Sequence, residues 1–147
     1  MIETLKTLFN RDLTKLKLEI ESYQNENLIW YTGKNISNSA GNLCLHIIGN
    51  LNTYIGAQLG ETNYIRNRDL EFSSKDIPRA LLIAQIEATI QTVNDALHLI
   101  RDKDLKNEYP LLVFEAKTST EFLLIHLTTH LAYHLGQINY HRRLLDS

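Results

Sequence analysis

Apolar residues recur every three or four positions in four separate stretches of this 147-residue chain, with polar and charged side chains between them. This spacing is typical of amphipathic helices. It predicts helices over Ile2 to about Tyr23, Ser39 to Gly60, Ser73 to about Ile100, and Thr118 to about Leu145. Because four long helices in so short a chain can share one core, we expect an all-α four-helix bundle, with residues 1–147 as a single domain.

Residue types at the helix ends support these limits. Gly60 suits the end of the second predicted helix, because glycine commonly follows or ends a helix. Ser73 with Asp76 loosely resembles a capping box at the start of the third helix. Thr118 with Glu121 repeats this pattern at the start of the fourth.

Long polar connections separate the predicted helices. They cover residues 24–38, 61–72 and 101–117. Trp30 and Tyr31 are expected to be tucked inside the first connection, and the second is expected to be a loop because it lacks a clear period. In the third, Leu111–Phe114 could form a short extended piece. Connections of this length allow a path other than simple up-and-down order.

The composition narrows the class of protein. The chain is 44% hydrophobic, which is enough for one sizeable core, and its formal net charge of −2 with scattered Lys and Arg argues against a nucleic-acid partner. The N-terminus lacks the apolar stretch of a signal peptide, and no segment has the length of a membrane span. The single cysteine, Cys44, suits a reducing compartment, so we expect a cytoplasmic protein.

A column of histidines in the last predicted helix is the clearest indication of chemistry. His126, His130 and His134 are spaced by four residues, so their imidazoles lie along one face of a helix. Two imidazoles at this spacing can bind one metal ion, as they do in helical zinc motifs. A further ligand must come from another helix, and His46 is the natural candidate because it lies in the middle of the second predicted helix.

These polar positions also have less specific interpretations. Asn42, His46, Asn50 and Thr53 share a side of the second helix that a solvated polar face would explain equally well. The histidine column could be a structural stripe, although adjacent imidazoles need partners when they are desolvated. His98 and His141 lie near helix C-termini, where a partial positive charge is favoured, and need no site.

Three segments carry a resemblance to a known family. They are Ser39-Ala-Gly-Asn-Leu-Cys-Leu-His-Ile-Ile-Gly-Asn50, Arg66-Asn-Arg-Asp-Leu-Glu-Phe72 and His130-Leu-Ala-Tyr-His-Leu-Gly-Gln137. Their pattern resembles the DinB-like superfamily, in particular an uncharacterised sub-family of it. The resemblance implies a four-helix bundle in which His46, His130 and His134 bind a divalent metal. Some members are transferases or isomerases that use low-molecular-weight thiols such as bacillithiol or mycothiol, and many have no assigned reaction.

Three neutral imidazoles would leave coordination positions open, which is typical of a catalytic metal site. Zinc or nickel suits such a site, and iron, cobalt and manganese use the same ligand type. The chain has no His-Glu-x-x-His and no Glu-x-x-His, which argues against a zincin protease or a carboxylate di-iron site. Cys44 points to a different side of the helix from His46 and is interpreted as a core residue.

Residues around the proposed ligands are candidates for supporting roles. Ligating imidazoles usually donate their other ring N–H to an acceptor. The candidates for such contacts are Asn42, Asn50, His126 and Gln137, and His126 could instead be a ligand or a core residue. Arg66 and Arg68 could hold an anionic part of a substrate, or could simply be solvated or paired with Asp69 and Glu71.

Three classes of function are consistent with this sequence. The first is a divalent-metal-dependent enzyme, such as a transferase that joins a small thiol to an electrophile. The second is a metal-binding module without turnover, such as a sensor, a buffer or a stress-related protein. The third is a structural or interaction domain with incidental histidines. Ala132 and Gly136 leave room for close packing, which would allow a homodimer.

Overall fold

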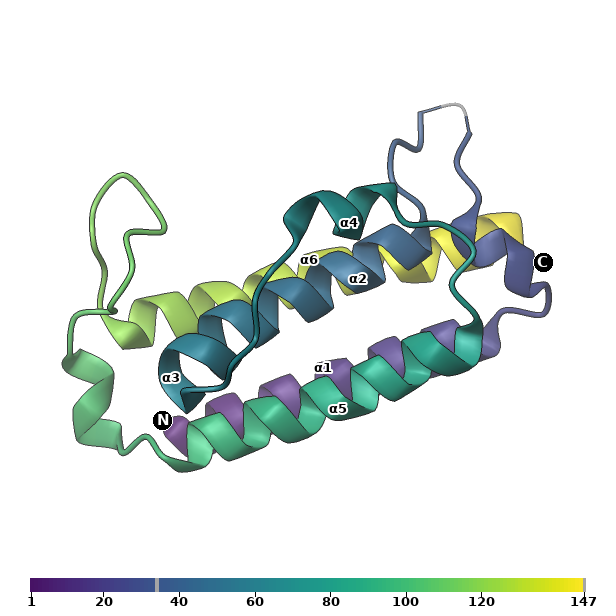
Figure 1. The fold of residues 1–147 in the computed structure, drawn as a ribbon. Coiled ribbons are helices and arrows are strands. Elements are labelled where there is room, and N and C mark those ends of the chain that lie inside the picture. Colours follow the sequence, from purple (N-terminus) through teal and green to yellow (C-terminus); the bar gives the residue numbers. More distant parts are fainter. Residues whose placement is uncertain (34, 147) are drawn as a thin grey trace.

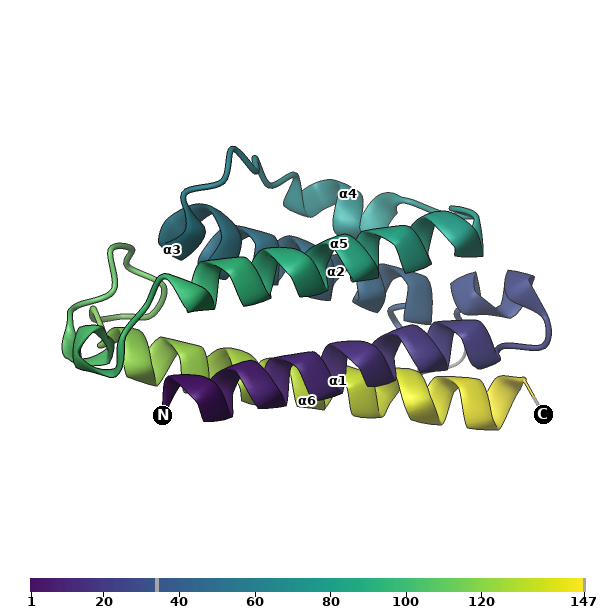
Figure 2. The ribbon, with the colours of Figure 1, turned by 90° about the horizontal axis from the view of Figure 1, so that it is seen from below.

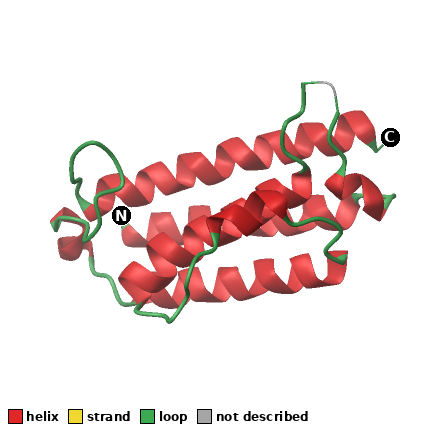
Figure 3. Ribbon diagram, turned by 45° about the horizontal axis from the view of Figure 1, so that its top comes forward, coloured by secondary structure: helices red, strands yellow, loops and turns green. Residues whose placement is uncertain are grey.

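The regular elements of the chain are helical throughout residues 1–33 and 35–146, the part that this computed structural model describes (Figure 3). The long helices are α1 (Ile2–Ser22), α2 (Ala40–Leu51), α5 (Arg79–His98) and α6 (Thr120–Leu145). The π-helical segment η2 (Asn52–Ala57) and α3 (Gln58–Gly60) continue α2. The short elements are η1 (Glu26–Trp30), α4 (Arg68–Ser73) and η3 (Asp102–Lys106). The all-α prediction is confirmed for the described residues.

The four long helices lie side by side (Figures 1 and 2). Helix α1 packs against α5 and α6, and α2 also packs against α5 and α6. Helices α1 and α6 run in one direction, whereas α2 and α5 run in the other (Figure 1). Because α2 and α5 are parallel, the chain between them must return along the length of the molecule. This return path places α4 on the outer side of α2 (Figure 1).

The apolar stripes predicted from the sequence form the core between these helices. On α1 the stripe is almost completely buried. Its residues are Ile2, Leu5, Phe9, Leu13, Leu16 and Ile20. Each buried aliphatic side chain of this size stabilises the fold by roughly 1.5–3 kcal/mol through the hydrophobic effect. The core therefore fixes the relative positions of α2 and α6, which carry the candidate site.

The start of the third long helix differs from the prediction. Helix α5 begins at Arg79, not near Ser73, and Asp76 has a left-handed backbone with φ of 58°. The predicted capping box of Ser73 and Asp76 is therefore wrong. The reason is Pro78, because the residue before a proline is disfavoured in helical geometry and Ile77 cannot extend the helix backwards.

Residues 61–72 are not entirely a loop, because they contain most of α4. The Asn67 side chain accepts a hydrogen bond from the Leu70 backbone N–H and caps this short helix. In the preceding connection Trp30 is buried as expected, but Tyr31 is 45% exposed.

Smaller differences occur at other ends and connections. Glu61, rather than Gly60, takes the left-handed conformation that ends α3. Ser119, rather than Thr118, caps α6 by accepting from the Phe122 N–H. The predicted extended piece at Leu111–Phe114 does not form a strand.

Candidate metal centre

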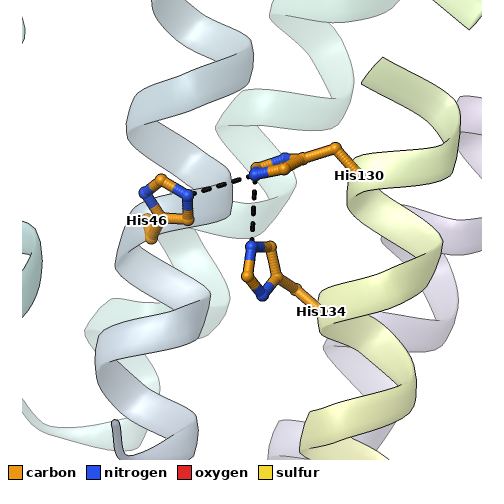
Figure 4. Close-up of side chains that lie close together, drawn as sticks. All are labelled: His46, His130 and His134. Carbon is orange, nitrogen blue, oxygen red and sulfur yellow. Dashed lines mark hydrogen bonds between the residues drawn. The ribbon is translucent and has the colours of Figure 1, made fainter. Parts of the chain in front are cut away.

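Three imidazoles from two packed helices converge on one point. His46 lies on α2, and His130 and His134 lie one turn apart on α6. The Nε2 atom of His130 is 3.2 Å from Nε2 of His46 and 3.1 Å from Nε2 of His134 (Figure 4). One ring nitrogen from each residue lies within 4.8 Å of the others, so this group could hold a metal ion.

The two separations from His130 Nε2, 3.2 Å and 3.1 Å, are close to the donor spacing of a metal site. Tetrahedral zinc with Zn–N bonds of about 2.0–2.1 Å places two nitrogen ligands about 3.3 Å apart. Two of the three ring nitrogens that face away from the centre have oxygen acceptors. His46 Nδ1 lies 3.0 Å from Glu71 Oε1, and His134 Nδ1 lies 2.7 Å from Gln137 Oε1. Oxygen acceptors at these positions favour the tautomer with Nδ1 protonated and Nε2 free.

The protons available in the cluster are too few for its close nitrogen contacts. A neutral imidazole has one N–H, and those of His46 and His134 point away toward their oxygen acceptors. His130 Nε2 can then donate to only one of its two neighbours. At least one of the close N···N contacts therefore brings two lone pairs together. A bound cation would satisfy them, so the residues fit a metal.

Burial keeps two of the imidazoles neutral. His46 is 7% exposed, and this burial is the main reason why its pKa lies below the usual value for histidine. Burial, and then the neighbouring His134 and His46, lower the pKa of His130 to about 4. Both imidazoles are therefore neutral at pH 7, as a metal ligand must be.

Glu71 is a buried carboxylate behind His46, and the sequence did not indicate this role. It lies on α4, is 5% exposed and faces His46 Nδ1. Arg66 donates to the same carboxylate through Nε at 2.8 Å and through Nη2 at 2.9 Å. The buried carboxylate is therefore compensated by a bidentate ion pair.

Of the residues expected to support the ligands, Gln137 makes the expected contact, whereas Asn42 and Asn50 have other surroundings. Gln137 contacts His134, as the spacing suggested. Asn42 makes no hydrogen bond to His46 within the described part of the chain, because its Nδ2 donates to the backbone carbonyls of Glu71 and Ser74. Asn50 is 7% exposed, and its Oδ1 has no hydrogen-bond partner in the described part of the chain. The polar side of α2 is therefore buried, and its interpretation as a solvated face is wrong.

His126 lies next to the three converging histidines but outside their group. Its ring stacks on His130 with centroids 6.2 Å apart and meets the edge of Phe114 at 4.8 Å. His141 is also explained without the site. Its ring is buried, with Nδ1 2.7 Å from the Tyr23 hydroxyl and Nε2 donating to the Tyr31 carbonyl at 2.9 Å.

A pocket of about 270 Å³ opens beside the converging histidines. Its lining includes both candidate arginines but no acidic side chain. The lining residues are His46, Asn50, Tyr54, Arg66, Arg68, Val113, His126, Leu127 and His130. Arg66 forms a salt bridge with Glu71, which is the alternative to substrate binding that the sequence analysis gave for this residue. Arg68 makes no salt bridge in the described ranges, and its guanidinium lies 5.7 Å from the Phe72 ring centroid.

Comparison with known families places the chain in a group without an assigned function. Residues 2–147 match the sequence model of one family, described as "Protein of unknown function (DUF1572)". The chain belongs to the DUF1572 family. No curated protein matches the DUF1572 chain significantly. The family therefore agrees with the expectation of an uncharacterised group and assigns no reaction to the site.

Other features of the DUF1572 chain agree with their sequence interpretation. Cys44 is fully buried, and burial raises the pKa of its thiol to about 12, as expected for a core residue rather than a nucleophile. Among the described helices, none combines the length and apolar character needed to cross a membrane. Ala132 and Gly136 lie beside a groove between α6 and α1, and the homodimer stays a prediction.

Proposed function

We propose that the DUF1572 chain is a divalent-metal-dependent enzyme with the four-helix bundle of the DinB-like superfamily. His46, His130 and His134 would hold the metal, and a small thiol would react with an electrophile in the adjoining pocket. The observation that carries this proposal is the convergence of three Nε2 atoms beside a pocket that contains no further metal-ligating acid. A three-nitrogen site with open positions suits catalysis better than a closed structural role.

The reaction class follows from the ligand set and the pocket. A zinc or nickel ion, when bound, supplies Lewis acidity that favours the thiolate form of a thiol. In the substitution, a sulfur–carbon bond forms, the bond from carbon to the leaving group breaks, and the leaving group takes the bonding electrons. The thiol proton passes to solvent. Leu127 and Val113 supply the apolar part of the pocket lining.

Arg68 and Asn50 would bind the polar part of the thiol substrate. Arg68 lines the pocket and has no acidic partner among residues 1–33 and 35–146, whereas the guanidinium of Arg66 is bound to Glu71. Asn50 is buried in the same lining, and its amide oxygen, which has no hydrogen-bond partner among the described residues, can accept from an N–H or O–H group of the substrate. The absence of any acidic lining residue favours a ligand with a negative group, such as a carboxylate. We therefore assign substrate binding to Arg68 and Asn50 rather than to Arg66.

The substitution Arg68→Gln tests this assignment. We expect it to weaken binding of mercaptoacetate to the zinc-loaded protein roughly fivefold, because a partly exposed charge pair contributes about 1 kcal/mol. Binding of 2-mercaptoethanol, which has no carboxylate, should change less than about twofold. Isothermal titration calorimetry measures both. Lys75→Gln, an exposed cation outside the pocket, is the matched control, and equal losses for the two thiols would contradict the assignment.

Turnover decides between an enzyme and a metal-binding module. Zinc- and nickel-loaded protein should accelerate the reaction of cysteine or glutathione with 1-chloro-2,4-dinitrobenzene above the solution rate, followed by absorbance of the thioether. His130→Ala should reduce the rate to that of the solution. Tight metal binding without acceleration across a panel of thiols and electrophiles would instead support a sensor or buffer.

A further inference from the structure

We infer that Glu71 is a positioning residue for His46, and that α4 is docked on α2 in order to place its carboxylate there. The contact would fix the orientation and tautomer of the His46 ring, so that Nε2 is presented as a lone pair toward His130 and His134. This inference rests on the proposed metal centre. It concerns a residue that neither the histidine spacing nor the family match assigns.

The carboxylate is held on two sides. Its Oε1 lies 3.0 Å from His46 Nδ1, and Arg66 donates hydrogen bonds to both of its oxygens. A carboxylate that is 5% exposed is costly to bury without compensation. With Arg66 as its counter-ion, Glu71 remains charged and accepts the ring N–H strongly, because hydrogen bonds to ionised groups are about twice as strong as neutral ones.

Two further features of α2 support the position of Glu71 beside His46. Asn42, one turn before His46, donates through Nδ2 to the backbone carbonyls of Glu71 at 3.0 Å and of Ser74 at 2.8 Å. Gly49 lies under the carboxylate, and a Cβ there would come within 2.6 Å of Glu71 Cδ. The Asn42 hydrogen bonds therefore hold α4 against α2, and Gly49 leaves the space that the Glu71 carboxylate occupies.

The three histidines are therefore supported unequally. His134 has a neutral and exposed amide partner, Gln137, and the Nδ1 atom of His130 has no hydrogen bond in the described residues. His46 is the member with a charged acceptor. Carboxylate–histidine–metal arrangements raise ligand basicity, and loss of such partners typically costs roughly 10- to 100-fold in metal affinity.

A purely structural role for Glu71, as an anchor of α4, makes a different prediction. It would affect the free energy of unfolding but leave the His46 tautomer unchanged. The test therefore uses Glu71→Gln, with Asp69→Asn as the matched control, because Asp69 is an exposed carboxylate on the same short helix. Zinc affinity is measured by competition with a chromophoric chelator, and the tautomer by long-range ¹H–¹⁵N correlation spectra of the metal-free chains.

We expect metal-free wild type to show His46 protonated at Nδ1, and Glu71→Gln to show a mixed tautomer and roughly 10- to 100-fold weaker zinc binding. Asp69→Asn should match wild type in both. Wild-type affinity in Glu71→Gln, or an Nε2-protonated His46 in wild type, would overturn the inference. If wild type binds no metal, the proposed function fails, and the tautomer spectrum still decides the role of Glu71. If Glu71→Gln does not fold, the role of Glu71 is decided by the His46 tautomer in wild type and by the tautomer and zinc affinity of Glu71→Asp. Glu71→Asp keeps the negative charge on a shorter side chain.

Discussion

Replacing His130 with alanine is expected to lower metal affinity more than any other single change. His130 is the central member of the group, with its Nε2 within hydrogen-bond distance of both other histidines. Its removal leaves two imidazoles on different helices. Loss of a direct ligand should cost more than the roughly 100-fold upper range seen for residues that only orient a ligand. Elemental analysis after dialysis, together with chelator competition, measures the effect.

Two other histidines provide controls for this substitution. His126 belongs to the same column on α6 but not to the converging group, so His126→Ala should retain the metal. His98 is exposed at the end of α5, and His98→Ala should behave as wild type. Loss of metal in His126→Ala equal to that in His130→Ala would move the site one turn along the helix. Equal metal content in wild type and His130→Ala would exclude the group altogether.

Gly49→Ala is expected to damage both stability and metal binding. The added methyl group would overlap the Glu71 carboxylate, which is buried and held by Arg66 and cannot swing into solvent without breaking that pair. Overpacking of this kind typically destabilises a protein by about 1–3 kcal/mol. The displaced carboxylate would also lose its hydrogen bond with His46 Nδ1, so zinc affinity should fall by roughly 10- to 100-fold. Chemical denaturation and chelator competition measure the two effects.

Gly136→Ala is the matched comparison on α6. Apart from the neighbouring backbone of α6 itself, no atom of the described residues lies within 4 Å of a Cβ at Gly136, and alanine is more favourable than glycine in a helix by roughly 0.5–1 kcal/mol. We therefore expect Gly136→Ala to be neutral or stabilising, with unchanged zinc affinity. If Gly49→Ala were as stable as wild type with unchanged affinity, the close packing of Glu71 on α2 would be wrong.

Periodicity predicted the long helices because their stability comes from one continuous apolar stripe each. It also placed His46, His130 and His134 on two helices, and the structure brings these residues together. The start of α5 was wrong because Ser73 and Asp76 matched a capping pattern whereas Pro78 limits the helix. Local patterns compete in this way wherever two signals fall within a few residues.

Glu71 was missed for a different reason. It lies in a polar segment without a clear period, and its contacts to His46 and Arg66 form only when that segment returns along α2. Asn67 was the one local signal for α4, since an Asn cap precedes the short helix. Asn42 was assigned to His46 by spacing, but the same return path gives it closer acceptors in the backbone of α4 and the segment after it. Long-range docking, which sequence spacing does not encode, decided both cases.

The central claim is that His46, His130 and His134 hold one divalent ion, and X-ray absorption spectroscopy of the zinc-loaded chain tests it most directly. We predict one zinc per chain, with three imidazole nitrogens at about 2.0–2.1 Å from the metal. Oxygen or nitrogen donors, rather than sulfur, should fill the remaining coordination positions. A sulfur ligand at about 2.3 Å, fewer than three imidazoles, or no retained zinc would contradict the claim.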